Sequence, residues 1–153
     1  MRNVILSLIV LCCACAWQTS AAQHDDRKRF AAVDIYLDSG EPVAAWQFEF
    51  SSRNGRMKIV GLENGESKAF GGTPYYDREA VQRGTADRII VADFTLAGAN
   101  ELPSGRIRIA TLHLMLTGAD APQFDLELVT AVTHEGRTID ASISLESQIV
   151  RKR

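Results

Sequence analysis

Residues 105–118, GRIRIATLHLMLTG, form the longest alternating segment of this chain. Apolar and polar side chains follow each other with the period of a β-strand that has one face in a core. The alternation slips by one residue in the middle, because Ile107 and Ile109 share one face whereas Ala110 shares the other with the leucines that follow. Two structures produce such a slip: a β-bulge near Ile109–Ala110, or a strand that leaves one sheet and joins another.

Shorter segments on both sides alternate in the same way. In VAAWQFEF, residues 43–50, one face carries Ala44, Trp46, Phe48 and Phe50, and we expect that face to be buried. Asn54-Gly55 predicts a hairpin turn. Further strands are predicted over residues 33–38, 56–62, 87–96, 124–128 and 139–145, with one helical turn across 77–82. Strands at a spacing of roughly ten residues are typical of a β-sandwich, so we predict one all-β domain of seven to nine strands.

The first 22 residues predict a Sec-type signal peptide. Arg2 supplies a short positive start and is followed by an apolar run from Val4 to Trp17. Ser20-Ala21-Ala22 supplies the small residues of a cleavage site after Ala22, with cleavage after Ala21 as the near alternative. The protein is therefore expected to be exported, to the periplasm or the exterior. All three cysteines lie within this leader, so the mature chain is expected to lack disulfides and thiols. A lipoprotein with acylated Cys15 is the alternative.

Charge argues against nucleic acid as the ligand. The chain has 17 basic and 19 acidic residues, and removal of the leader takes away only Arg2. A global basic field is therefore missing. Two basic triplets, Arg27-Lys28-Arg29 and Arg151-Lys152-Arg153, flank the predicted sandwich. We interpret them as solvated ends, in a polar lead (residues 23–30) and a basic tail (147–153), with weak attraction to an anionic surface as the alternative.

Two pairs of stretches resemble the cohesin domain family. PVAAWQFEFSS (42–52) with RMKIVGLENG (56–65) looks like the opening of a cohesin-type module, and IIVADFTL (89–96) with LPSGRIRIATLHLMLTG (102–118) looks like its later half. The likeness covers residues 31–146 and implies a nine-stranded, jelly-roll or immunoglobulin-like sandwich, related also to carbohydrate-binding modules, that binds proteins or glycans without catalysis.

Cohesins pair with dockerins mainly through one sheet face. The resemblance places the corresponding strands around residues 57–62, 87–95 and 105–116, and leaves open whether a dockerin-type partner exists.

The sequence offers no catalytic constellation, so we expect neither an enzyme nor a cofactor. His24, His113 and His134 are far apart, with His113 outward on its strand and His134 in a turn, and no nucleophile or zinc-binding motif accompanies them. Two metal sites are weaker alternatives. The first pairs Asp125 with Glu127 for calcium, and the second uses His24, third from the N terminus after cleavage at Ala21, for copper or nickel. Asp34 and Asp38 are expected on a solvent face.

The segment FGGTPYYDREAVQRG, residues 70–84, differs from its alternating neighbours. Adjacent residues of an extended chain point to opposite sides, so one of Tyr75 and Tyr76 is expected to plug the sandwich and the other to face outward. We interpret the segment mainly as a crossover, and secondly as a partner-binding surface. The candidate binding residues are Tyr75, Tyr76, Asp77, Arg78 and Asp93.

The leading hypothesis is thus a secreted, non-catalytic module that binds a protein or polysaccharide, in an oligomeric state that the sequence leaves open. An alternative is an assembly subunit that pairs through a strand edge. A third reading is a hydrolase built around Asp93 near the two tyrosines.

Overall fold

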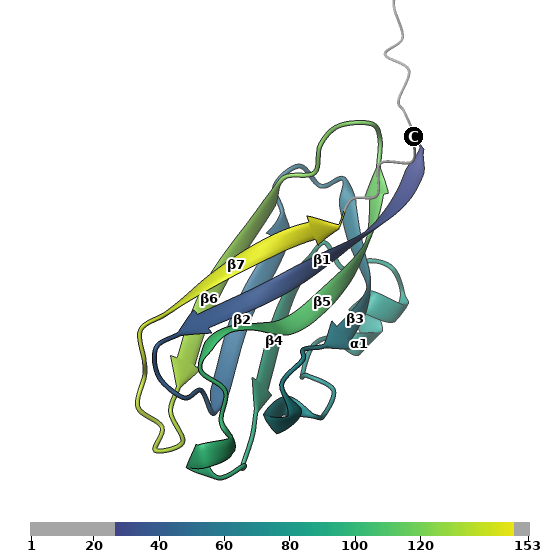
Figure 1. The fold of residues 1–153 in the computed structure, drawn as a ribbon. Coiled ribbons are helices and arrows are strands. Elements are labelled where there is room, and N and C mark those ends of the chain that lie inside the picture. Colours follow the sequence, from purple (N-terminus) through teal and green to yellow (C-terminus); the bar gives the residue numbers. More distant parts are fainter. Residues whose placement is uncertain (1–26, 149–153) are drawn as a thin grey trace, which may run out of the picture.

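The computed structural model describes residues 27–148 and shows two antiparallel sheets packed face to face (Figure 1). One sheet has the order β3-β5-β1-β7 and the other has the order β4-β2-β6. The strands are β1 (Lys28–Ser39), β2 (Ala45–Ser52), β3 (Met57–Asn64), β4 (Arg88–Phe94), β5 (Gly105–Thr117), β6 (Phe124–Val132) and β7 (Ala141–Gln148). The helical pieces are η1 (Lys68–Phe70), α1 (Arg78–Gln82) and η2 (Ala99–Glu101). The all-β sandwich is confirmed, with seven strands in the described residues.

The predictions for the leader, for Cys15, for His24 and for Arg151-Lys152-Arg153 lie outside the described residues. β1 begins at Lys28, inside the segment that the sequence marks as a polar lead, because Lys28 to Phe30 pair with Thr117 to Met115 of β5. Within residues 27–148, the longest helical pieces are too short and too polar to cross a membrane.

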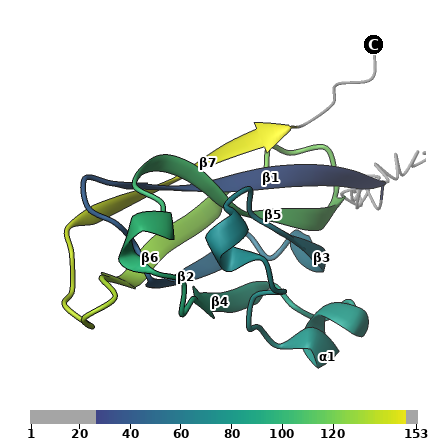
Figure 2. The ribbon, with the colours of Figure 1, turned by 60° about the horizontal axis from the view of Figure 1, so that its bottom comes forward.

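Both sheets contribute to a single core. Trp46, Phe48 and Phe50 of β2 are at most 1% exposed, as the alternation predicts. They face fully buried aliphatic side chains of the other sheet, which include Ile35, Leu37, Leu112 and Leu114. Trp46 stacks on Phe48 with ring centroids 5.7 Å apart. The two rows of side chains interdigitate as they do in other aligned sandwiches, and Figure 2 shows the two layers nearly edge-on.

The slip in β5 is a bulge. Ile35 of β1 lies opposite Ala110 and Tyr36 lies opposite Arg108, so Ile109 has no partner in β1. Ile109 is 3% exposed and Ala110 is fully buried, which places two successive side chains in the core. β5 pairs with β1 on both sides of this point, from Thr117 to Gly105. It therefore stays in one sheet, and the alternative of a change of sheet is wrong.

Three other expectations need correction. Asn54-Gly55 is a turn, with Gly55 at φ +65°, but it carries the chain from one sheet to the other and forms no hairpin. The segments 57–62, 87–95 and 105–116 do not share a sheet, because β4 lies in the three-stranded one. Asp34 is only 8% exposed, because Thr111 on β5 donates a hydrogen bond to its carboxylate between the strands.

Candidate binding surface

β4 is apolar on both of its faces. Ile89 and Val91 point into the core, where they are at most 3% exposed. Ile90 and Phe94, at the other parity, are 45% and 53% exposed on the outside of the three-stranded sheet. Large apolar side chains on the solvent side of a strand are not needed to build the sandwich. Their gathering in one column is typical of an interaction surface.

Tyr75 extends this column sideways. Its backbone forms a two-way bridge with Ala92 at the free edge of β4, through N–H···O bonds of 2.7 and 3.0 Å. The Tyr75 ring then stacks on Phe94, with centroids 5.9 Å apart and an interplanar angle of 12°. Tyr75 is 62% exposed, so the stacked pair presents an aromatic surface to solvent. We call Tyr75, Ile90, Phe94 and Leu96 the β4 shelf.

A shallow groove adjoins the β4 shelf. Leu96, which follows β4, is 93% exposed at its margin. The groove has a volume of about 340 Å³ and its lining includes Phe94, Leu96, Ala45, Val132 and His134. Phe94 lies opposite Ala45, and Ala45 lies opposite Val132, so the floor is formed by neighbouring strands of one sheet. The floor of the groove is therefore apolar.

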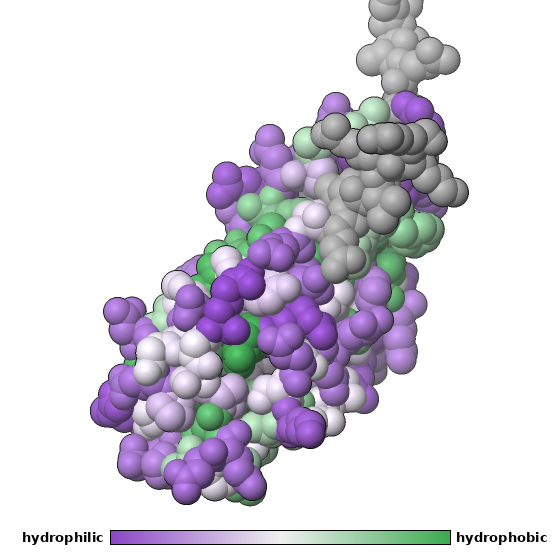
Figure 3. Space-filling view, viewed as in Figure 1, coloured by the Kyte–Doolittle hydropathy of each residue, from purple (hydrophilic) through white to green (hydrophobic). Residues whose placement is uncertain are grey.

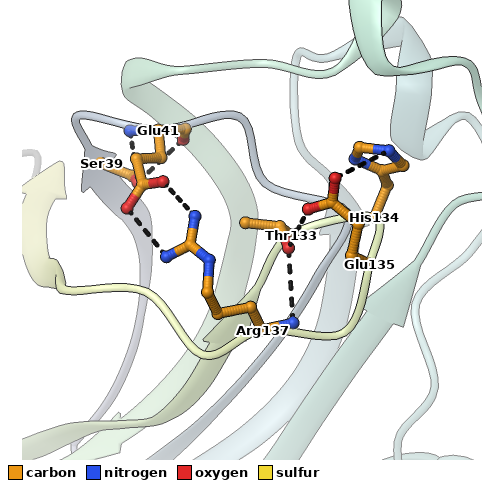
Figure 4. Close-up of polar contacts among 6 residues, drawn as sticks. All are labelled: Ser39, Glu41, Thr133, His134, Glu135 and Arg137. Carbon is orange, nitrogen blue, oxygen red and sulfur yellow. Dashed lines mark hydrogen bonds and ion pairs between the residues drawn. The ribbon is translucent and has the colours of Figure 1, made fainter.

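The polar loop from Thr133 to Arg137 contributes Thr133, His134 and Gly136 to the lining of the groove, and Figure 4 shows the contacts of this loop. The loop from Thr133 to Arg137 carries His134, whose Nε2 lies 3.5 Å from Glu135 Oε1. Arg137 forms a two-pronged ion pair with Glu41, which joins this loop to the β1–β2 connection. The Arg137 guanidinium holds the pKa of Glu41 below its usual value. The ion pair thereby holds the loop against the β1–β2 connection and places charged side chains beside the groove.

The outer face of the four-stranded sheet has a different character. Figure 3 shows this face, and most of its surface is hydrophilic, with small separate hydrophobic spots. Its polar side chains are engaged with one another: His113 Nε2 lies 2.8 Å from Glu63 Oε1, and the Arg106 guanidinium lies 3.6 Å from the Tyr36 ring centroid. The stacked aromatic pair of the β4 shelf therefore lies on the other side of the molecule, with the three-stranded sheet.

The candidate residues from the sequence divide between surface and interior. Tyr75 faces outward, while Tyr76 packs against the core with the Arg78 guanidinium 5.7 Å from its ring centroid. One tyrosine out and one in is what the extended chain predicts. Asp77 caps α1 by accepting a hydrogen bond from the Ala80 amide at 2.9 Å. Of these candidates, Tyr75 alone belongs to the β4 shelf, where its ring stacks on Phe94.

Asp93 is an interior residue. It is 7% exposed and lies opposite Trp46 on the inner side of the sheet. Burial raises the pKa of its carboxyl group, and a hydrogen bond from the Phe94 amide opposes that rise only in part. Its side chain therefore lies on the core side of β4, away from the β4 shelf on the outer side.

The residues considered for chemistry do not converge. Between residues 27 and 148, no three histidine, cysteine or acidic side chains are grouped so that they could hold a metal. The Asp125 carboxylate, considered for calcium, is engaged by the Arg53 guanidinium. His113 and His134 each contact a glutamate and lie on different sides of the molecule.

Sequence reasoning missed Ile90, Phe94 and Leu96. A signal for them was present, since DRIIVADFTL has apolar residues at both parities and its only acid within the strand, Asp93, at the inner one. A strand of that kind either is covered on both faces or exposes an apolar face. Since the sequence predicts almost no helix that could cover the outer face, this strand could have been predicted to expose an apolar face.

Comparisons with known proteins show which fold this chain has. No protein-family model matches the chain, and no curated protein matches it in sequence. Its structure is similar to a non-cellulosomal cohesin from Archaeoglobus fulgidus, with a TM-score of 0.52, 13% identity and 75% of each chain covered. It is also similar to a chain of a type I cohesin–dockerin complex from Clostridium thermocellum, with a TM-score of 0.53, 10% identity, and 76% of this chain and 84% of that chain covered. The chain has a cohesin-like fold.

Proposed function

We propose that this protein is an exported, non-catalytic module that binds another protein through the β4 shelf and the adjoining groove. Export rests on the leader predicted for residues 1–22. The proposal is supported by the cohesin-like fold, since one of the similar structures is a cohesin–dockerin complex. Fold alone does not assign a ligand, so the argument depends on the surface itself.

The observation that carries the proposal is the exposed, stacked pair of Tyr75 and Phe94 beside Leu96. Aromatic side chains held rigidly at a surface are typical centres of protein interfaces, because they bury much area at little entropic cost. The polar loop at Thr133–Arg137 then corresponds to the rim that surrounds such a centre.

A protein fits this surface better than a polysaccharide. Sugar binding needs hydrogen-bonding side chains beside the aromatic ring, to pair with the hydroxyl groups. Around Phe94 the groove presents Leu96, Ala45 and Val132, which offer no side-chain hydrogen bonds. The hydrogen-bonding side chains of its lining, Thr95, Thr133 and His134, already contact polar groups of the protein itself. One face of each stacked ring is also covered by the other ring, so Tyr75 and Phe94 do not form a flat row.

Affinity capture followed by titration tests the proposal. The full chain, recovered in its processed form, is the bait for envelope and secreted fractions of the source organism. A captured protein is then purified and titrated against wild type, Leu96→Asp, and Phe30→Asp as the matched control. Phe30 is 73% exposed but lies on the four-stranded sheet, outside the β4 shelf. All three chains are first compared by circular dichroism.

We expect Leu96→Asp to weaken binding by about 30-fold or more, as loss of an interface centre does, and Phe30→Asp to bind as wild type does. Equal binding by wild type and Leu96→Asp would place the interface elsewhere. Retention of glycans and no protein would contradict the choice of partner.

A further inference from the structure

β7 is an open edge of the four-stranded sheet. It pairs with β1 over eight residues, from Ala32 opposite Gln148 to Ser39 opposite Ala141, without a register shift. In the described part of the chain, no backbone hydrogen bond joins β7 to anything besides β1. Its sequence, ASISLESQ, contains no proline and no lysine. A regular edge of this kind presents unpaired N–H and C=O groups to any matching strand. Figure 1 shows β7 at the margin of the sheet.

The other three edges are protected. β3 has a bulge at Val60, between the pairs Ile59–Leu114 and Gly61–His113, and it carries Lys58. β6 has a bulge at Val129, between its pairings with Gln47 and Phe48. The edge of β4 is closed in its middle by the backbone bridge to Tyr75. Bulges, charges and coverage are the usual means by which proteins prevent edge pairing. In the described chain β7 has no bulge and no cover, and its one charged side chain, Glu146, is paired with Arg106.

The inner side of this edge is incompletely covered. Ile143 and Leu145 pack against the core but remain partly exposed. Leu126 and Leu128 of β6, on the opposite sheet, are also only half-buried. A strand added beyond β7 would cover this seam between the sheets, so side-chain burial would add to the backbone hydrogen bonds.

We propose that β7 pairs antiparallel with β7 of a second copy of this chain, about a two-fold axis near Ser144. The two four-stranded sheets then become one continuous sheet of eight strands. This proposal is independent of the proposed function, because the β4 shelf lies on the other sheet of the sandwich.

A second copy suits this edge because the strand is complementary to itself. With the axis at Ser144, the two Ser144 residues lie opposite each other and Glu146 lies opposite Ser142 of the second copy, so no like charges meet. Glu146 is also already paired with Arg106, 2.7 Å away in its own chain. Small hydroxyl side chains let two backbones approach to the distance of a β ladder.

Charge along the strand favours the same arrangement. β1 extends past the end of β7 with the exposed Lys28, whereas the exposed Asp140 directly precedes the start of β7. Antiparallel pairing brings the basic end of one copy beside the acidic end of the other. A parallel arrangement would set like ends together, which opposes association.

Sedimentation equilibrium, with static light scattering as a second method, tests this proposal on the full chain in its processed form. We expect the weight-average mass to rise from one copy toward two as the concentration increases from about 1 to about 200 µM, since dimerisation follows mass action. Ser144→Lys sets two lysines face to face at the axis and should weaken dimerisation at least tenfold. Gln82→Lys, the same charge at an exposed position on α1, should dimerise as wild type does.

Circular dichroism first establishes that both variants fold. A wild type that stays at the mass of one copy throughout this range overturns the proposal. So does a Ser144→Lys variant that dimerises as strongly as wild type, and so does growth beyond two copies, because a two-fold axis closes the assembly.

Discussion

Asp93 and Trp46 are neighbours in the core that both lack a full set of hydrogen bonds. They lie opposite each other on β4 and β2, and within the described chain Asp93 Oδ2 and Trp46 Nε1 are buried without a partner. Among residues 27–148 no basic side chain forms an ion pair with this carboxylate, and burial raises its pKa. A buried group of this kind costs stability when it is charged.

We therefore predict that Asp93→Asn stabilises the protein at neutral pH. Because burial raises the pKa of Asp93 in the folded state, its neutral carboxyl group stabilises the folded protein fully below the unfolded pKa, near 3.8. This stabilisation is lost as the pH rises through the folded pKa. The asparagine variant avoids this loss and should be about 1 kcal/mol more stable at pH 7. Urea unfolding at pH 7 and again near pH 3.5 checks it, and the gain should vanish at the lower pH. A gain of the same size at both values would contradict the assigned cause.

At the scale of the strand, the bulge at Ile109 gives β5 two buried residues in succession. Ile109 is the extra residue, so its deletion leaves Arg108 opposite Tyr36 and Ala110 opposite Ile35 as before. Deletion of Leu114, which has a partner in both β1 and β3, instead shifts by one residue either the end of β5 beyond it or the residues between it and the bulge. Such a shift turns the side chains of the shifted segment to the wrong face.

We predict that the Ile109 deletion folds and loses about 3 kcal/mol, the cost of removing a buried isoleucine. The Leu114 deletion, which also removes a fully buried side chain, should not fold. Circular dichroism and urea unfolding of the two deletions distinguish them. Two variants of similar stability would show that Ile109 is needed for the register itself.

How much the sequence predicts depends on how far apart in the chain the interacting residues are. The buried row of Trp46, Phe48 and Phe50, the bulge in β5 and the helical turn capped by Asp77 are written in residues a few positions apart. Which sheet a strand joins depends on residues far away in the chain. Asn54-Gly55 therefore predicts the turn, but not that the chain crosses to the other sheet there. The β4 shelf was missed for a related reason. Tyr75 and Phe94 are nineteen positions apart and meet only through the bridge to Ala92.

For the molecule as a whole, neither sheet has a core of its own. The buried side chains of β2 pack against those of β1 and β5, and Phe70 from the connecting segment packs edge-on against Trp46, with centroids 5.9 Å apart. Separation of the sheets would expose both rows at once. A small domain with one shared core is expected to unfold in a single cooperative step.

We therefore predict that probes of different parts of the molecule report one transition. In a Trp17→Phe background Trp46 is the only indole, and its fluorescence reports the interior between β2 and β4, whereas far-UV circular dichroism reports all seven strands. Urea unfolding followed by the two signals should give one midpoint and one slope. Most strand pairs here join residues far apart in the chain, so refolding should take milliseconds to seconds. A fluorescence midpoint below that of circular dichroism would mean that the three-stranded sheet opens first, and the β4 shelf would then lie on a part of the protein that unfolds independently.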